Sequence, residues 1–274
     1  MIKVQPTRWP GLAWALGLLA LAFAAQAGAA WVWVHVGGVR NLTLLAGLAN
    51  LTALVPVAVL GFWFSGEPPA FTPPTPIRAR FWLGLLLAAT GGTAVLGELA
   101  NLMAWLVPLP PELANLFNQV TLGPPLISLF TLAVVAPLTE EILFRGLFLR
   151  AFARRYGIWP ALVLSSALFA FFHLNVWQAL AAVFAGLYLG HLCLSSGSLW
   201  PPMVAHAWFN GLPVALAAIG LTVDGYNSPN VAGAASFQPW PWVAGGALLL
   251  GAGLVLTKRW APLPPPPVSD TVVP

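Results

Sequence analysis

The feature that most constrains this chain is a succession of long apolar runs, separated by short segments rich in proline, glycine and basic residues. Of its 274 residues, 59% are hydrophobic and only 7% are charged, whereas about 25% are charged in an ordinary soluble domain. An apolar run of ~20 residues is long enough to cross the hydrocarbon core of a bilayer as a helix. We therefore predict an all-α, polytopic membrane protein.

Eight runs are candidates for membrane spans, so we expect about eight transmembrane helices. The runs cover approximately residues 12–36, 42–64, 81–107, 122–150, 160–173 and 176–194, a seventh run from 202 onward, and 241–256. Pro108, Pro110 and Pro111 are expected to break the chain before the fourth run. The first run is longer than the ~7–15 apolar residues of a signal peptide, so we expect it to be retained. Residues 1–261 are predicted to form one transmembrane helical domain, and the Pro-rich segment 262–274 a disordered tail.

Basic residues outside the runs indicate the orientation. With eight spans, nine of them fall at one end of the bundle and only Arg40 at the other; the nine are Lys3, Arg8, Arg78, Arg80, Arg150, Arg154, Arg155, Lys258 and Arg259. Basic residues accumulate on the cytoplasmic side of membrane proteins. We therefore expect a multi-pass protein of the bacterial cytoplasmic membrane with both termini in the cytoplasm, and no nucleic-acid partner. The single cysteine excludes an intramolecular disulfide.

The fourth run contains three charged residues, Glu140, Glu141 and Arg145. Each ionised side chain near the centre of a bilayer costs roughly 2.5–3.5 kcal/mol on insertion scales, so the cluster needs a reason. On a helix, Glu141 and Arg145 share a face, whereas Glu140 is rotated from Glu141 by ~100°. Arg145 can then hold one carboxylate ionised while the other faces a cavity as a base. Pro137 lacks an N–H group, so we expect a kink just before the pair. A purely structural ion-pair network is the alternative.

Two later runs supply polar partners. His173 ends the fifth run, and His206 lies four residues before Asn210 in the seventh, so these two side chains share a helical face and can donate to one developing negative charge. By the predicted topology, His173 reaches the same depth as Glu140 only if the fifth span is tilted or short. We expect an intramembrane active-site cavity that is accessible from the cytoplasm.

The order of these residues resembles the three motifs of the CAAX protease and bacteriocin-processing family, which includes the type II CAAX prenyl endopeptidases. The motifs are Glu140-Glu141-x-x-x-Arg145, Phe169-x-x-x-His173 and His206-x-x-x-Asn210, within residues 120–215. The resemblance implies an intramembrane endopeptidase without a cofactor. It also implies that Glu140 and His173 activate a water, that His206 and Asn210 form the oxyanion hole, and that Glu141 and Arg145 support the site. The expected partners are the bilayer and a peptide or protein substrate, with a lipidated (prenylated, CAAX-type) substrate as one case.

Other functions are compatible with the same residues. Two Glu and two His side chains can ligate Zn²⁺, which would make the protein a membrane metalloprotease, although there is no H-E-x-x-H motif and Arg145 is a poor neighbour for a cation. A non-catalytic immunity or scaffold protein would keep the network for packing, and a transporter would use a carboxylate as a proton relay. Glu98 and Asn101, three residues apart in the third run, either border the cavity or bond to a neighbouring helix.

Overall fold

A computed structural model of the chain describes residues 10–66, 71 and 76–258. The predicted tail at 262–274 and the basic residues Lys3, Arg8 and Arg259 lie outside the described residues. Within these ranges all regular structure is helical, and no strand is present. The prediction of an all-α, polytopic membrane protein is confirmed.

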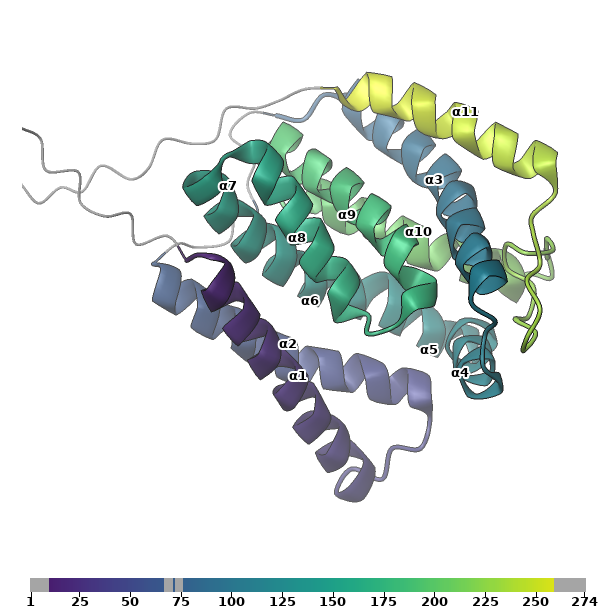
Figure 1. The fold of residues 1–274 in the computed structure, drawn as a ribbon, viewed down its shortest axis with the longest axis horizontal. Coiled ribbons are helices and arrows are strands. Elements are labelled where there is room, and N and C mark those ends of the chain that lie inside the picture. The colour runs from purple at the N-terminus through teal and green to yellow at the C-terminus, as the bar shows by residue number, and fades with distance from the viewer. Residues whose placement is uncertain (1–9, 67–70, 72–75, 259–274) are drawn as a thin grey trace, which may run out of the picture.

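Every run that the sequence indicated forms helix, with one helix in addition (Figure 1). The elements are α1 (Leu12–His35), α2 (Leu42–Ser65), α3 (Ala79–Leu106), α4 (Pro111–Leu122), α5 (Pro125–Leu129), the π-helix η1 (Phe130–Val135), α6 (Ala136–Glu141), the π-helix η2 (Ile142–Leu149), α7 (Arg150–Tyr156), α8 (Ile158–Phe172), α9 (Val176–Ser196), α10 (Trp200–Ala218) and α11 (Trp240–Thr257).

Six helices in the described part of the chain are long and apolar enough to cross a membrane. They are α1, α2, α3, the continuous helix Pro125–Tyr156 that comprises α5 to α7, α9 and α11. The other two predicted spans are α8, which is apolar but only 15 residues long, and α10, which carries His206 and Asn210. The predicted count of eight is therefore approximate, and the two helices that fall short both carry candidate site residues.

The additional helix is α4, at a place where Pro108, Pro110 and Pro111 were expected to break the chain. Pro110 is the N-cap and Pro111 is the first residue of α4. A proline at the first position of a helix costs little, because the N–H that it lacks would have no intrahelical partner there. The prolines start this helix.

The helices form three groups (Figure 1). On one side, α3 and α11 make the most extensive helix pair of the fold, and on the other side α1 pairs with α2. The segment α5 to α10 lies between these pairs. Its apolar core is centred on Phe144, Phe148 and Phe152, which are completely buried; the ring of Phe148 meets Phe144 edge-on and stacks on Phe152. This central group carries the candidate site.

The two ends of the bundle differ in charge. We call the end with α7 the basic end, because Arg150, Arg154 and Arg155 lie there; Lys258, Arg78 and Arg80 also lie at this end (Figure 1). We call the opposite end the loop end. It is formed by the turn at residues 36–41, by α4, and by the loop of residues 219–239 between α10 and α11. Asn118 on α4 binds Asn230 of that loop through its side chain, so α4 and the loop are joined.

Candidate active site

Glu140 and Glu141 lie at the end of α6, between two π-helical segments. In η1 the N–H of Ala136 bonds to the carbonyl of Thr131, five residues earlier. The residue that would bond to Leu132 in the same way is Pro137, which has no N–H. π-Helical turns inside α-helices occur frequently at functional sites. The expected interruption before the Glu pair thus takes the form of a π-helical segment.

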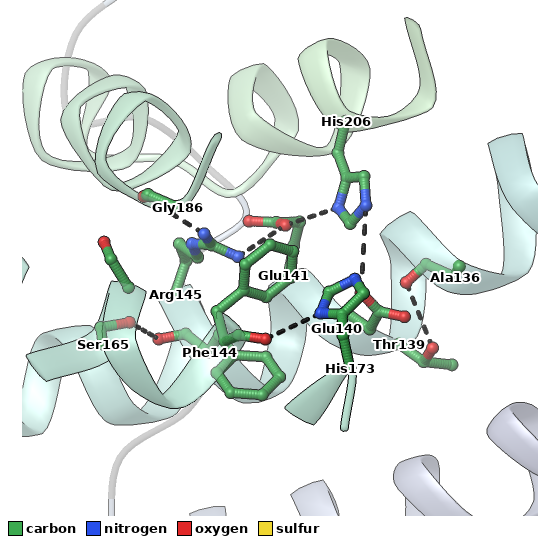
Figure 2. Close-up of polar contacts among 12 residues, drawn as sticks. Ala136, Thr139, Glu140, Glu141, Phe144, Arg145, Ser165, His173, Gly186 and His206 are labelled. Carbon is green, nitrogen blue, oxygen red and sulfur yellow. Dashed lines mark hydrogen bonds and ion pairs between the residues drawn. The ribbon is translucent and has the colours of Figure 1, made fainter. Parts of the chain in front are cut away.

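Glu141 is the centre of a buried polar network. Its Oε1 accepts a hydrogen bond from Nη1 of Arg145 at 2.8 Å and lies 2.8 Å from Nδ1 of His206 on α10 (Figure 2). Nη2 of Arg145 donates to the carbonyl of Gly186 on α9 at 3.2 Å, and its guanidinium stacks 4.3 Å from the ring of Phe169 on α8. Glu141 and Arg145 are completely buried. The pair predicted from spacing is present, and it joins four helices.

Glu140 points away from that network toward the two histidines (Figure 2). Its Oε2 lies 3.9 Å from Nε2 of His206, and it interacts electrostatically with both His206 and His173. Only 6% of its surface is exposed. His206 therefore stands between the two carboxylates, with one ring nitrogen facing each.

His173 reaches this depth because α8 is short. The helix has 15 residues, and His173 is its C-cap, which meets the condition that the fifth span be tilted or short. Nδ1 of His173 lies 2.9 Å from the carbonyl oxygen of Phe169. Because a carbonyl can only accept, Nδ1 carries the proton and Nε2 of a neutral ring has the free lone pair. The ring of Phe169 contacts both His173 and His206 edge-on.

Asn210 compensates for Pro137. Its Nδ2 donates to the carbonyl of Leu132 at 2.9 Å, the carbonyl left without its π-helical partner by the proline. A side-chain amide has two N–H donors, so one N–H group remains for another acceptor. Helical spacing predicted that Asn210 shares a face with His206. Only the structure shows that Asn210 also bonds to the carbonyl that Pro137 leaves without a backbone donor.

One cavity adjoins these residues. It has a volume of about 230 Å³, and its walls include His173, His206 and Asn210. Further wall residues are Thr93, Gln178 and Tyr226. Tyr226 belongs to the loop of residues 219–239, and among the described residues no wall comes from α7. The cavity lies on the loop-end side of the bundle, because α8 ends and α10 continues toward that end; the expectation that it is accessible from the cytoplasm stays a prediction.

Several residues of the network were not singled out from the sequence. The backbone of Gly186 and the hydroxyl of Tyr226 have no local sequence signal, although Phe169 belongs to one of the three motifs. Glu98 and Asn101 do not line this cavity. Glu98 accepts from the backbone N–H of Gln238 at 3.0 Å, and Asn101 donates to the carbonyl of Gly225 at 2.7 Å. They fasten the 219–239 loop to α3.

The described residues contain no group of three His, Cys, Asp or Glu side chains that could hold a metal ion. Oε1 of Glu141 already accepts from the guanidinium of Arg145 and lies against Nδ1 of His206. Of the four residues considered for Zn²⁺, the remaining three do not form such a group. The side chains as placed therefore do not fit the zinc alternative.

Fold and site together define a polytopic α-helical membrane protein with a buried Glu/His cluster beside an internal cavity. Residues 122–212, which include all three motifs, match the family model for type II CAAX prenyl endopeptidase Rce1-like proteins. The match confirms the family resemblance over this segment of the chain.

Two curated proteins are similar over about half of the chain. An uncharacterized 24.3 kDa protein of Escherichia coli is 31% identical over 131 residues, which is 46% of this chain and 58% of that protein. CAAX prenyl protease 2 of Rattus norvegicus is 34% identical over 129 residues, 46% of this chain and 36% of that protein. The chain thus covers less than two thirds of either relative. No solved structure matches it.

Proposed function

We propose that this chain is an intramembrane endopeptidase that hydrolyses a peptide bond of a membrane-associated protein or peptide with an activated water. The observation that carries the proposal is the convergence of Glu140 on His173 and His206, two histidines that line one cavity inside an apolar bundle. Ionisable side chains inside a membrane are costly and generally functional. The family match over the same residues supports a protease.

In the proposed first step, Glu140 and His173 take a proton from a water in the cavity. His173 suits this role because the bond of its Nδ1 to Phe169 leaves the lone pair on Nε2. The hydroxide forms a bond to the carbonyl carbon of the substrate, and the π electrons of the carbonyl move to its oxygen. Glu140 and His173 hold the proton that was removed.

The oxyanion formed in this way requires hydrogen-bond donors. We assign this role to Nε2 of His206, when protonated, and to the free N–H of Asn210, because both residues line the cavity. Removing one such donor typically lowers kcat about 10²–10³-fold. When the tetrahedral intermediate collapses, the C–N bond breaks and the amine leaves with the proton that the base had taken. Atoms and charge balance without a cofactor.

Glu141 and Arg145 act as supports in this mechanism. Glu141 accepts a hydrogen bond from the Nδ1–H group of His206 and thereby orients the ring, leaving Nε2 to face Glu140 and the cavity. Arg145 neutralises Glu141 in an otherwise apolar environment. Glu140 is the carboxylate left for proton transfer, because its neighbours are histidines and not a cation.

The substrate class is tested directly. Full-length protein reconstituted in liposomes is incubated with prenylated CAAX-type peptides and with unmodified membrane-associated peptides, and products are identified by mass spectrometry. We expect cleavage that disappears in Glu140→Gln and His173→Ala but persists in Glu112→Gln, an exposed glutamate on α4. Cleavage that survives Glu140→Gln would overturn the proposal. A folded Glu140→Gln protein that retains its cellular phenotype would favour the immunity or scaffold alternative.

The same cleavage assay also tests the zinc alternative, by addition of a chelator. We expect cleavage to persist in the presence of a chelator. Loss of cleavage on chelation, restored by added Zn²⁺ alone, would replace the proposed water activation by a metal-dependent one.

A further inference from the structure

The site cavity does not end at the catalytic side chains. A second cavity of about 320 Å³ shares six wall residues with it: Ala100, Gln178, Phe209, Asn210, Pro213 and Tyr226. We call the site cavity the inner cavity and the second one the outer cavity. The outer cavity extends to Phe117 and Thr121 on α4 and to Asn230 of the 219–239 loop. Continuous walls therefore connect the site with the loop end of the bundle.

The outer cavity has the chemistry of a peptide-binding channel. The described residues that line it include neutral hydrogen-bonding side chains, namely Asn101, Thr121, Gln178 and Asn230, between apolar ones, and no Asp, Glu, Lys or Arg. An extended peptide offers one N–H and one C=O group per residue, and both must be satisfied away from water. Neutral amides can serve either group, so this lining suits an uncharged peptide segment and has no group that would recognise a charged one.

Tyr226 stands where the two cavities meet. It lines both of them and also a third cavity of about 180 Å³ at the loop end. Its hydroxyl donates to Oγ1 of Thr93 at 2.8 Å, and its ring contacts Trp242 at 5.4 Å between centroids. Burial raises the pKa of Tyr226, so the hydroxyl remains a donor at neutral and mildly alkaline pH.

The loop that carries Tyr226 is held in place by α3. Gly225, directly before it, accepts from Asn101, and Gln238 at the far end of the loop donates through its backbone to Glu98. Nε2 of Gln238 also donates to the carbonyl of Ala94 at 2.8 Å. The loop is therefore bonded to α3 on both sides of Tyr226, and these bonds fix the position of its ring between the two cavities.

We propose that the inner and outer cavities form one channel for an extended, uncharged peptide segment, which enters at the loop end, and that Tyr226 positions this segment at the junction. The inference rests on the proposed function. It adds a positioning residue outside the segment that matches the family model and an entrance at the end opposite to the basic residues.

The first test compares Tyr226→Phe with Tyr188→Phe in the reconstituted full-length protein. Tyr188 is the control, because it is a buried tyrosine whose hydroxyl also bonds within the protein, to the carbonyl of Leu85, but it lines a different, almost entirely apolar cavity. For peptides extended on one side of the cleaved bond, Tyr226→Phe should raise KM about two- to tenfold, because the ring loses the hydrogen bond to Thr93 that positions it, and one neutral hydrogen bond is worth about that factor. Its kcat should stay within about twofold, and Tyr188→Phe should change neither. Equal KM values in wild type and Tyr226→Phe would overturn the positioning role.

A second test blocks the entrance. Val231 lines the third cavity and is exposed, so Val231→Cys offers a thiol at the loop end; Lys258→Cys offers one at the basic end. The wild type, whose single Cys193 is buried, controls for the reagent. A bulky, membrane-impermeant thiol reagent should slow cleavage several-fold in Val231→Cys only. Inhibition of Lys258→Cys instead, or of neither labelled variant, would overturn the entrance at the loop end.

The two proposals fail in different ways. If the wild type does not cleave, or cleaves equally after Glu140→Gln, the proposed function is wrong. If cleavage depends on Glu140 but is insensitive to Tyr226→Phe and to the label at residue 231, only the channel is wrong.

Discussion

Nδ1 of His206 and Nη1 of Arg145 both lie 2.8 Å from the same oxygen, Oε1 of Glu141. One carboxylate oxygen thus links α10 to the helix that carries the Glu pair, at a point with no exposure to solvent. A buried ion pair is not in itself evidence of a stabilising interaction, because desolvation offsets the attraction. Its consequence here is geometric: it fixes the ring of His206 between Glu141 and Glu140.

Glu141→Gln should destabilise the protein and lower its activity. The amide keeps an acceptor for His206 but leaves the buried guanidinium of Arg145 without a counter-charge, and breaking such a pair costs about 3–5 kcal/mol. Thermal unfolding in detergent measures the loss. The double variant Glu141→Gln/Arg145→Met should lose less than the sum of the single variants, with a coupling of about 0.5–3 kcal/mol. Additive losses would show that the pair does not act as a unit.

Pro137→Ala should lower activity without lowering stability. Alanine restores an N–H that can bond within the helix and compete with Asn210 for the carbonyl of Leu132. Asn210 would then lose its anchor, and we expect a fall in cleavage rate of about tenfold or more if it supplies an oxyanion donor. Pro56→Ala, inside α2, is the control for proline removal from a helix interior. Unchanged cleavage in Pro137→Ala would contradict the link between Pro137 and Asn210.

Gly186→Ala should disturb the site through the backbone of α9. An added Cβ would lie 2.8 Å from Cβ and 2.9 Å from Cα of Ser166, so α8 and α9 must separate and the carbonyl of Gly186 must move away from Arg145. Gly190→Ala is the matched control one turn later, because its Cβ would approach within 3 Å only the flexible end of Leu162. We expect a loss of activity and of melting temperature in Gly186→Ala only, measured on the same preparations. Equal behaviour of the two variants would contradict the role of Gly186.

Gly253→Ala should separate α3 from α11. Its Cβ would lie 2.4 Å from the backbone nitrogen of Ala88 and 2.4 Å from the carbonyl of Gly84, whereas at Gly251 nothing lies within 4 Å. Close approach of membrane helices depends on such small residues. We expect a lower melting temperature for Gly253→Ala and an unchanged or higher one for Gly251→Ala, since alanine favours helix. A stability loss of the same size in both would exclude the packing explanation.

Much of the site was accessible from the sequence because helical spacing is local. The four-residue separation of Glu141 and Arg145 predicted their contact, and a chain with so few charges left few partners for the Glu pair. The partner of His206 was not predictable in this way. Which carboxylate it meets depends on the rotation and depth of α10 relative to α6, and neither is encoded within one helix.

One prediction was wrong, and one feature of the site was not predictable, each for a physical reason. The prolines at 108–111 were interpreted as a break, yet Pro111 begins α4, because the same residue that stops a helix is tolerated at its first position. The position of the cavity within the bundle was not predictable from the sequence. Its walls include Tyr226, and no helical spacing in the sequence relates this residue to the site. Hydrogen bonds from the 219–239 loop to Glu98 and Asn101 of α3 hold Tyr226 there.

The sequence by itself determined the all-helical membrane architecture and most of the spans, and it indicated the family resemblance and the residues of the candidate site. Those properties follow from hydrophobic length, charge and the helical repeat, which act over a few neighbouring residues. The tertiary structure alone decided that His206 binds Glu141, that Asn210 compensates for Pro137, and that the cavity continues toward the loop end. Each of these depends on how helices far apart in the chain approach and rotate, and that is settled by packing over the whole bundle.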